Sequence, residues 1–76
     1  MITEKKLIKI FCEENDCDDA IDLIDIFGDI MLSGVVPGIC KNCGVISDSN
    51  EPDATENYCS QCNTNSVISI NVLLGY

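Results

Sequence analysis

Two pairs of closely spaced cysteines constrain the fold of this chain more than any other feature. Cys40 and Cys43 are separated by two residues, as are Cys59 and Cys62, and fifteen residues lie between the two pairs. This spacing is typical of a site in which four thiolates hold one zinc ion at a Zn–S distance of about 2.3 Å. Two intervening residues let one tight turn direct both sulfurs to the same ion. We therefore expect one zinc ion per chain.

The residues that follow each pair fit the same turn. A positive φ is favoured after the second cysteine, and Gly44 adopts it freely while Asn63 tolerates it. Iron can occupy the same thiolate cage, as in rubredoxin-like sites, and two disulfides or four free thiols are also compatible with the spacing. Because four thiolates fill the tetrahedral zinc shell, no position stays open for water or substrate. The predicted site is structural rather than catalytic.

The length of the chain explains why such a site is needed. A chain of 76 residues fits one domain, over residues 1–76, and buries only about 60% of its unfolded surface, so its hydrophobic core is marginal. A structural zinc ion can add about 10–16 kcal/mol of apparent folding free energy. The first residues lack the order of a signal peptide, which predicts a cytoplasmic, reducing location where paired cysteines bind metal more often than they form disulfides.

The charge balance excludes several functions. Thirteen acidic residues face four lysines, with no Arg and no His, for a formal charge of −9, and Lys41 is the only basic residue beyond position 9. Binding to nucleic acid requires clustered Lys and Arg, so the composition argues against it. The absence of His and Arg also removes the usual general base and the bidentate phosphate ligand. We expect a protein that is not an enzyme.

The first half of the chain, residues 1–34, is predicted to form a helical hairpin. Residues 3–14 carry apolar side chains at helical spacing, with Thr3 as the N-cap, and Asn15-Asp16 breaks the pattern. A second helix is predicted over residues 18–32, where Leu23, Phe27, Ile30 and Met31 repeat at helical spacing before Ser33-Gly34 ends it.

The second half, residues 35–76, is predicted to form a zinc ribbon. Val45-Ile46 suits a short strand, and residues 47–55 suit a loop. Ile68, Ile70, Val72 and Leu74 alternate with other residues at the period of a half-buried strand. Short connections favour antiparallel pairing. The fold class is therefore a small α+β domain in which a helical hairpin packs on a four-cysteine zinc ribbon with a short antiparallel sheet.

A row of aspartates is the second notable feature. Asp18, Asp22, Asp25 and Asp29 have offsets of 0, 4, 7 and 11, which puts all four carboxylates on one stripe of the predicted second helix. Such a stripe is either a negative ridge that docks a basic protein surface or the solvated back of an amphipathic helix. We expect the former. Cys12 and Cys17 could belong to a second metal site or a redox pair, but no other ligand accompanies them, so we expect a packed thiol and a half-buried free thiol.

The second half resembles a family of small phage-encoded zinc-ribbon proteins. The resemblance lies in Val36-Pro37-Gly38-Ile39-Cys40 and the rest of the first cysteine pair, in Glu51-Pro52-Asp53, in Tyr58 to Cys62, and in the apolar tail from Ser66 to Gly75. Members commonly carry Gly after the second cysteine pair, where this chain has Asn63. The resemblance implies a phage or prophage origin and residence in the host cytoplasm, but no activity.

Three functions remain in competition. The first is a zinc-stabilised interaction module, a phage accessory protein that binds and inhibits a host protein through its acidic surface; this is the function we expect. The second is a nucleic-acid-binding zinc ribbon, which the charge opposes. The third is a rubredoxin-like iron electron carrier, for which the chain offers no second redox feature. The sequence does not name the partner or the oligomeric state.

Overall fold

Four strands form one antiparallel sheet, and three helices lie beside it. The computed structural model describes residues 1–75. Its element order is α1 (Glu4–Glu14), α2 (Ala20–Met31), β1 (Val36–Cys40), β2 (Ile46–Asn50), β3 (Asn57–Cys59), β4 (Thr64–Ser69) and α3 (Ile70–Leu74). The strand order is β2-β1-β4-β3, with every neighbouring pair antiparallel. The predicted α+β fold, with an N-terminal helix pair and an antiparallel sheet, is confirmed.

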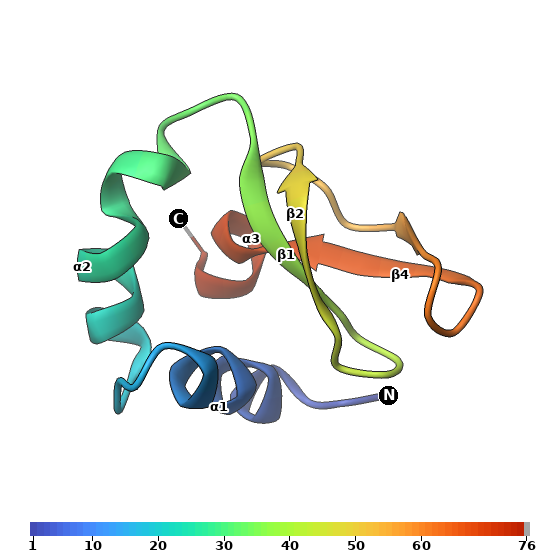
Figure 1. The fold of residues 1–76 in the computed structure, drawn as a ribbon, viewed down its shortest axis with the longest axis horizontal. Helices are drawn as coiled ribbons and strands as arrows, with labels where there is room; N and C mark the ends of the chain where they lie inside the picture. Colours follow the sequence, from blue (N-terminus) through green and yellow to red (C-terminus); the bar gives the residue numbers. More distant parts are fainter. Residues whose placement is uncertain (76) are drawn as a thin grey trace.

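The helix pair begins and ends for local reasons. The Thr3 side chain accepts a hydrogen bond from the Lys6 N–H, as predicted for an N-cap. After α1, Asp16 has a φ of 54°, which turns the chain out of the helix. In Figure 1, α1 runs along the bottom of the molecule and α2 rises at its left side, so the two helices meet at a corner.

The second helix begins later than the sequence predicted. Asp19 is its N-cap, and its Oδ1 accepts a hydrogen bond from the Asp22 N–H at 3.1 Å. The predicted start at residue 18 is therefore wrong by two residues, because the capping carboxylate belongs to Asp19 and the helix starts at Ala20. Asp18 lies outside α2.

The C-terminal segment corrects a second prediction. The expected strand through Ile70, Val72 and Leu74 ends at Ser69, and residues 70–74 form α3. The Ser69 Oγ accepts a hydrogen bond from the Val72 N–H at 3.1 Å, which caps the helix, and Gly75 at a φ of 70° ends it. The apolar side chains therefore follow helical rather than strand spacing.

The segment between the cysteine pairs is more ordered than predicted. Residues 46–50, placed mostly in a loop by the sequence, form β2 and pair with β1. Gly38, in β1, permits a close approach: a Cβ there would lie 2.7 Å from both the Asn50 Nδ2 and the Ile68 carbonyl oxygen. The segment 46–50 is therefore a strand because it pairs with β1 at Gly38, although its own polar sequence does not indicate a strand.

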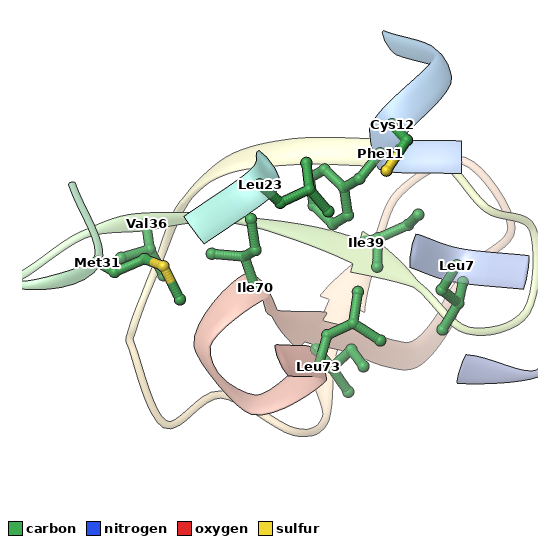
Figure 2. Packing of buried hydrophobic residues seen from close by; sticks show 10 residues of the cluster. Leu7, Phe11, Cys12, Leu23, Met31, Val36, Ile39, Ile70 and Leu73 are labelled. Atoms are coloured by element: carbon green, nitrogen blue, oxygen red, sulfur yellow. The ribbon is translucent and has the colours of Figure 1, made fainter. Parts of the chain in front are cut away.

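One hydrophobic core joins the helices to the sheet. Figure 2 shows its side chains converging from the three helices and β1. The buried members are Leu7, Phe11, Cys12, Leu23, Met31, Val36, Ile39, Ile68, Ile70 and Leu73. The short helix α3 contacts both other helices and strands β1 and β4, so it fills the space between the helix pair and the sheet. No helix within residues 1–75 combines the length and the apolar character needed to cross a membrane.

Candidate metal centre

The four cysteines of the two pairs meet at one end of the sheet. Cys40 is the last residue of β1 and Cys43 lies on the turn that leads to β2, while Cys59 is the last residue of β3 and Cys62 lies on the turn that leads to β4. Both turns lie at the right of Figure 1, opposite α2. Although β1 and β3 are separated by one strand in the sheet, β4 holds them together through its pairing with both. The pairing of the strands therefore brings the two cysteine pairs together, as predicted.

The two turns have the same geometry. The Gly44 N–H donates to the Cys40 carbonyl at 2.9 Å, and the Asn63 N–H donates to the Cys59 carbonyl at 2.8 Å. Gly44 has a φ of 80° and Asn63 a φ of 59°. The positive φ predicted after each pair is confirmed at both positions. The departure from Gly at Asn63 is accommodated, and its side-chain oxygen accepts a hydrogen bond from the Tyr58 hydroxyl at 2.7 Å.

The sulfur atoms are placed as ligands of a single ion. The Sγ atoms of Cys40 and Cys62 are 3.6 Å apart, as are those of Cys43 and Cys59, and all four lie within 4.8 Å of one another. At a metal–sulfur distance of about 2.3 Å, the edge of a regular tetrahedron is about 3.8 Å. The six cysteines of the chain are all free thiols, so the alternative of two disulfides is not the arrangement found. The cluster could hold one metal ion.

Two backbone N–H groups point to the sulfur of the buried Cys40. The N–H groups of Asn42 and Cys43 point to this sulfur at 3.3 and 3.4 Å, as the turn predicts. Burial raises the pKa of the Cys40 thiol, but the two N–H groups outweigh it, and the net pKa lies below its usual value. Such donors spread the charge of a thiolate and orient it toward a metal.

The thiols of Cys62 and Cys43 have pKa values shifted in opposite directions. A hydrogen bond from the Asn42 side chain, with a second from Thr64, lowers the pKa of Cys62 to about 6. The Val45 N–H lowers the pKa of Cys43, but desolvation and the three neighbouring sulfurs outweigh it and raise the value to about 12. Four sulfurs this close carry their full negative charge only beside a cation. The contacts from Asn42 and Thr64 could not be read from the cysteine spacing.

The metal centre is tied to the N-terminal half of the chain. The Ile2 N–H donates to the Lys41 carbonyl at 2.9 Å, and the Lys41 N–H donates to the Ser66 carbonyl at 2.8 Å. A Cβ at Gly44 would lie 3.2 Å from the Ile10 side chain and 3.3 Å from that of Ile2. The first turn is thus held between the N-terminus and β4, which sequence reasoning did not foresee.

The remaining cysteines lie apart from this centre. Cys12 is buried in the core that joins α1 and α2, and the half-buried Cys17 follows α1. Burial, followed by a hydrogen bond and charge from Cys17, raises the pKa of the Cys12 thiol to about 11. Within residues 1–75 the metal-ligand cluster contains neither of them. Their expected roles, a packed thiol and a half-buried one, match their burial.

The predicted aspartate stripe is only partly formed. Asp22, Asp25 and Asp29 lie on α2 at successive spacings of three and four residues, so they share one stripe. Asp18 precedes the helix and was wrongly placed on it; its backbone N–H donates to the Asp22 Oδ2 at 3.2 Å. Asp25 and Asp29 are exposed, whereas Asp22 is half-buried. The stripe is thus shorter than predicted, although Asp18 remains near it through that hydrogen bond.

Comparisons of the chain with protein-family models, curated proteins and solved structures found no match. The resemblance to small phage-encoded zinc-ribbon proteins therefore stays a prediction from the sequence motifs.

Proposed function

We propose that this protein is a zinc-stabilised interaction module that binds a basic surface of another protein through the acidic face of α2. The observation that carries the proposal is the combination of the exposed carboxylates of Asp25 and Asp29 with a nearly complete lack of basic residues beyond position 9. Such a face attracts cationic surfaces and repels nucleic acid.

The metal centre supports a structural role for the ion. The donor set is four thiolates, which zinc accepts in a closed tetrahedral shell, with Cys40, Cys43, Cys59 and Cys62 as ligands. The ion would stabilise the fold and leave no coordination position for a substrate. This favours a protein without enzymatic activity. Elemental analysis of protein purified without added metal separates zinc from iron, and iron would instead favour an electron carrier.

The biological setting is proposed from the sequence resemblance. The motif Pro37-Gly38-Ile39-Cys40 and the Glu51-Pro52-Asp53 loop support a phage accessory protein that acts in the host cytoplasm. A host protein that handles nucleic acid carries basic grooves, and an acidic face that occupies such a groove would inhibit it.

The proposal is tested by neutralising the acidic face. The partner is captured from bacterial lysate and identified by mass spectrometry. A variant in which Asn replaces Asp18, Asp22, Asp25 and Asp29 should still bind the metal but should bind this partner more weakly. Because exposed ion pairs each contribute about 0.2–1 kcal/mol, we expect roughly a tenfold or larger rise in Kd at low salt. Titration calorimetry measures it.

A matched control removes the same charge elsewhere. Amide substitutions at Glu4, Glu51, Asp53 and Glu56 change four exposed acidic residues outside α2. They should weaken partner binding much less than the α2 substitutions. If both variants lose the same amount of partner affinity, binding depends on net charge and not on the acidic face of α2, which contradicts the proposal. Binding of duplex DNA by the parent protein in a gel-shift assay would also contradict it.

A further inference from the structure

The helix α2 exposes apolar side chains beside its acidic stripe. Leu23 and Met31 face the core, but Ile26 is 47% exposed and Ile30 is 44% exposed. Ile30 was expected to follow the core repeat, but the structure places it on the surface, outside the core. Residues three or four apart are neighbours on a helix surface, so Ile26 lies between Asp22 and Asp29 and beside Ile30. A partner that covered the side chains of Ile26 and Ile30 would therefore also contact the carboxylates beside them.

A groove continues this apolar surface toward the sheet. Phe27 and Ile30 form one wall, Val35, Val36 and Pro37 form the second, and Asp48 and Ser49 of β2 close it. The cavity measures about 230 Å³. Val35 is 57% exposed at its mouth. This volume suits one or two apolar side chains of a partner rather than a small-molecule ligand.

One carboxylate lines the groove, and two more lie beside the apolar face of α2 that continues it. Asp48 lines the groove on the β2 side. On α2, Asp22 and Asp29 are the neighbours of Ile26, beside the groove, whereas Asp25 lies further around the helix, away from Phe27. The four lysines lie elsewhere: Lys5, Lys6 and Lys9 on α1, and Lys41 on the first cysteine turn. The groove therefore has a largely apolar lining, and Asp48 together with the neighbouring Asp22 and Asp29 forms an acidic rim to which no lysine of this chain belongs.

We propose that this groove binds a basic amphipathic helix of the partner protein, with apolar side chains in the groove and Lys or Arg against the rim. The inference rests on the proposed function and specifies the partner's chemistry. Asp22 and Asp29 are seven residues apart on one side of Ile26 and Ile30, and a basic amphipathic helix lying along α2 presents its cations with the same seven-residue repeat. A second copy of this chain does not fit, because it would bring two acidic rims together in a protein of charge −9.

The probe is a fluorescein-labelled peptide of about 18 residues built from Leu and Lys, with Leu along one helical face. One control peptide replaces every Leu with Ala and keeps the charge; a second replaces every Lys with Glu and keeps the apolar face. Fluorescence anisotropy at low salt should show the Leu/Lys peptide binding at least about tenfold more tightly than either control. Equal binding of the Leu/Lys and Ala/Lys peptides would overturn the groove while leaving the acidic face in place.

Two substitutions on the same helix locate the site. Ile30→Gln removes a groove wall, and we expect it to weaken the Leu/Lys peptide by about tenfold without changing the Ala/Lys peptide. Ile21→Gln is the matched control, because Ile21 is 70% exposed on α2 but does not line the groove. A similar loss from Ile21→Gln would overturn the assignment.

Further outcomes separate this inference from the proposed function. Substitution of Asp25 and Asp29 by Asn should weaken both basic peptides, and failure of either basic peptide to bind the parent would contradict the acidic face itself. Sedimentation equilibrium should find a monomer. A dimer that Ile30→Gln dissociates would show that a second copy occupies the groove and would overturn the choice of partner.

Discussion

Gly38 is the residue at which the sheet tolerates the least change. A Cβ at this position would lie 2.7 Å from the Asn50 side chain and from the Ile68 carbonyl oxygen on the neighbouring strand. Because backbone in a paired strand cannot move away cheaply, we expect Gly38→Ala to lower the free energy of unfolding by about 1–3 kcal/mol. Urea denaturation followed by circular dichroism measures the loss.

Gly34 supplies the control for this prediction. An added Cβ there meets no atom within 4 Å, so Gly34→Ala should leave the stability near that of the parent. If both alanine variants unfold at the same urea concentration, the close approach at Gly38 has no energetic consequence and the prediction is wrong.

Cys12 is predicted to be the less reactive thiol of the helical half. It is buried, and its pKa is raised to about 11, so at pH 8 little of it is the thiolate that reacts. In the folded protein, iodoacetamide should modify Cys12 at least about tenfold more slowly than the half-buried Cys17. Peptide mass spectrometry locates the label, and equal rates at the two positions would contradict the packing described for α1.

At the level of elements, α3 depends on Ser69. This residue is fully buried; its hydroxyl donates to the Pro52 carbonyl at 2.6 Å and accepts from the Val72 N–H at 3.1 Å. Ser69→Ala removes the helix cap and leaves the half-buried Pro52 carbonyl without that donor, which should cost about 1–3 kcal/mol of unfolding free energy. Thermal unfolding measures it, with the exposed turn residue Ser60→Ala as the control. A Ser69→Ala variant as stable as the control would refute the role of this cap.

The apolar spacing explains why the C-terminal helix was predicted as a strand. Ile68, Ile70, Val72 and Leu74 alternate as in a strand, but Ile70, Leu73 and Leu74 also fit helical spacing, and a short apolar run cannot distinguish the two. The choice is made by tertiary contacts. The Asn71 side chain donates to the Met31 carbonyl at the end of α2, forty residues away in the chain.

Local signals predicted both N-terminal helices but placed only α1 accurately. Thr3 and the apolar spacing of α1 predicted its position within a residue, whereas the start of α2 depended on which of three neighbouring aspartates caps it. The strand β2 was underestimated because its polar sequence, Ile46–Asn50, owes its order to pairing with β1.

Across the whole molecule, the cysteine turns connect segments that the sequence keeps apart. The first turn contacts the N-terminus through the Ile2 N–H and contacts β4 through the Lys41 N–H. The second turn joins β3 to β4. An ion held by both turns would therefore stabilise the sheet and, through Ile2 and Ile10, the packing of α1 against it.

The spacing of the cysteines was enough to predict the candidate site, because two residues between ligands fix the turn geometry independently of the rest of the fold. The groove beside Ile30 was not predictable in this way. It arises where α2 meets the start of β1 and the end of β2, and no local pattern in the sequence records that meeting.

The dependence of the fold on metal is the central claim of this account. The reduced protein is stripped of metal by a chelator and titrated with zinc while thermal unfolding is followed by circular dichroism. We expect cooperative unfolding to appear with about one equivalent of zinc, because a zinc ion held by four thiolates would supply about 10–16 kcal/mol to a chain whose core alone is marginal.

Matched cysteine variants make the same measurement specific to the site. Cys59→Ser should abolish the zinc-dependent transition, whereas the double variant Cys12→Ser and Cys17→Ser should keep it at one equivalent, because neither residue belongs to the sulfur cluster. A metal-free parent that unfolds cooperatively at the same temperature as the zinc-loaded protein would contradict the account.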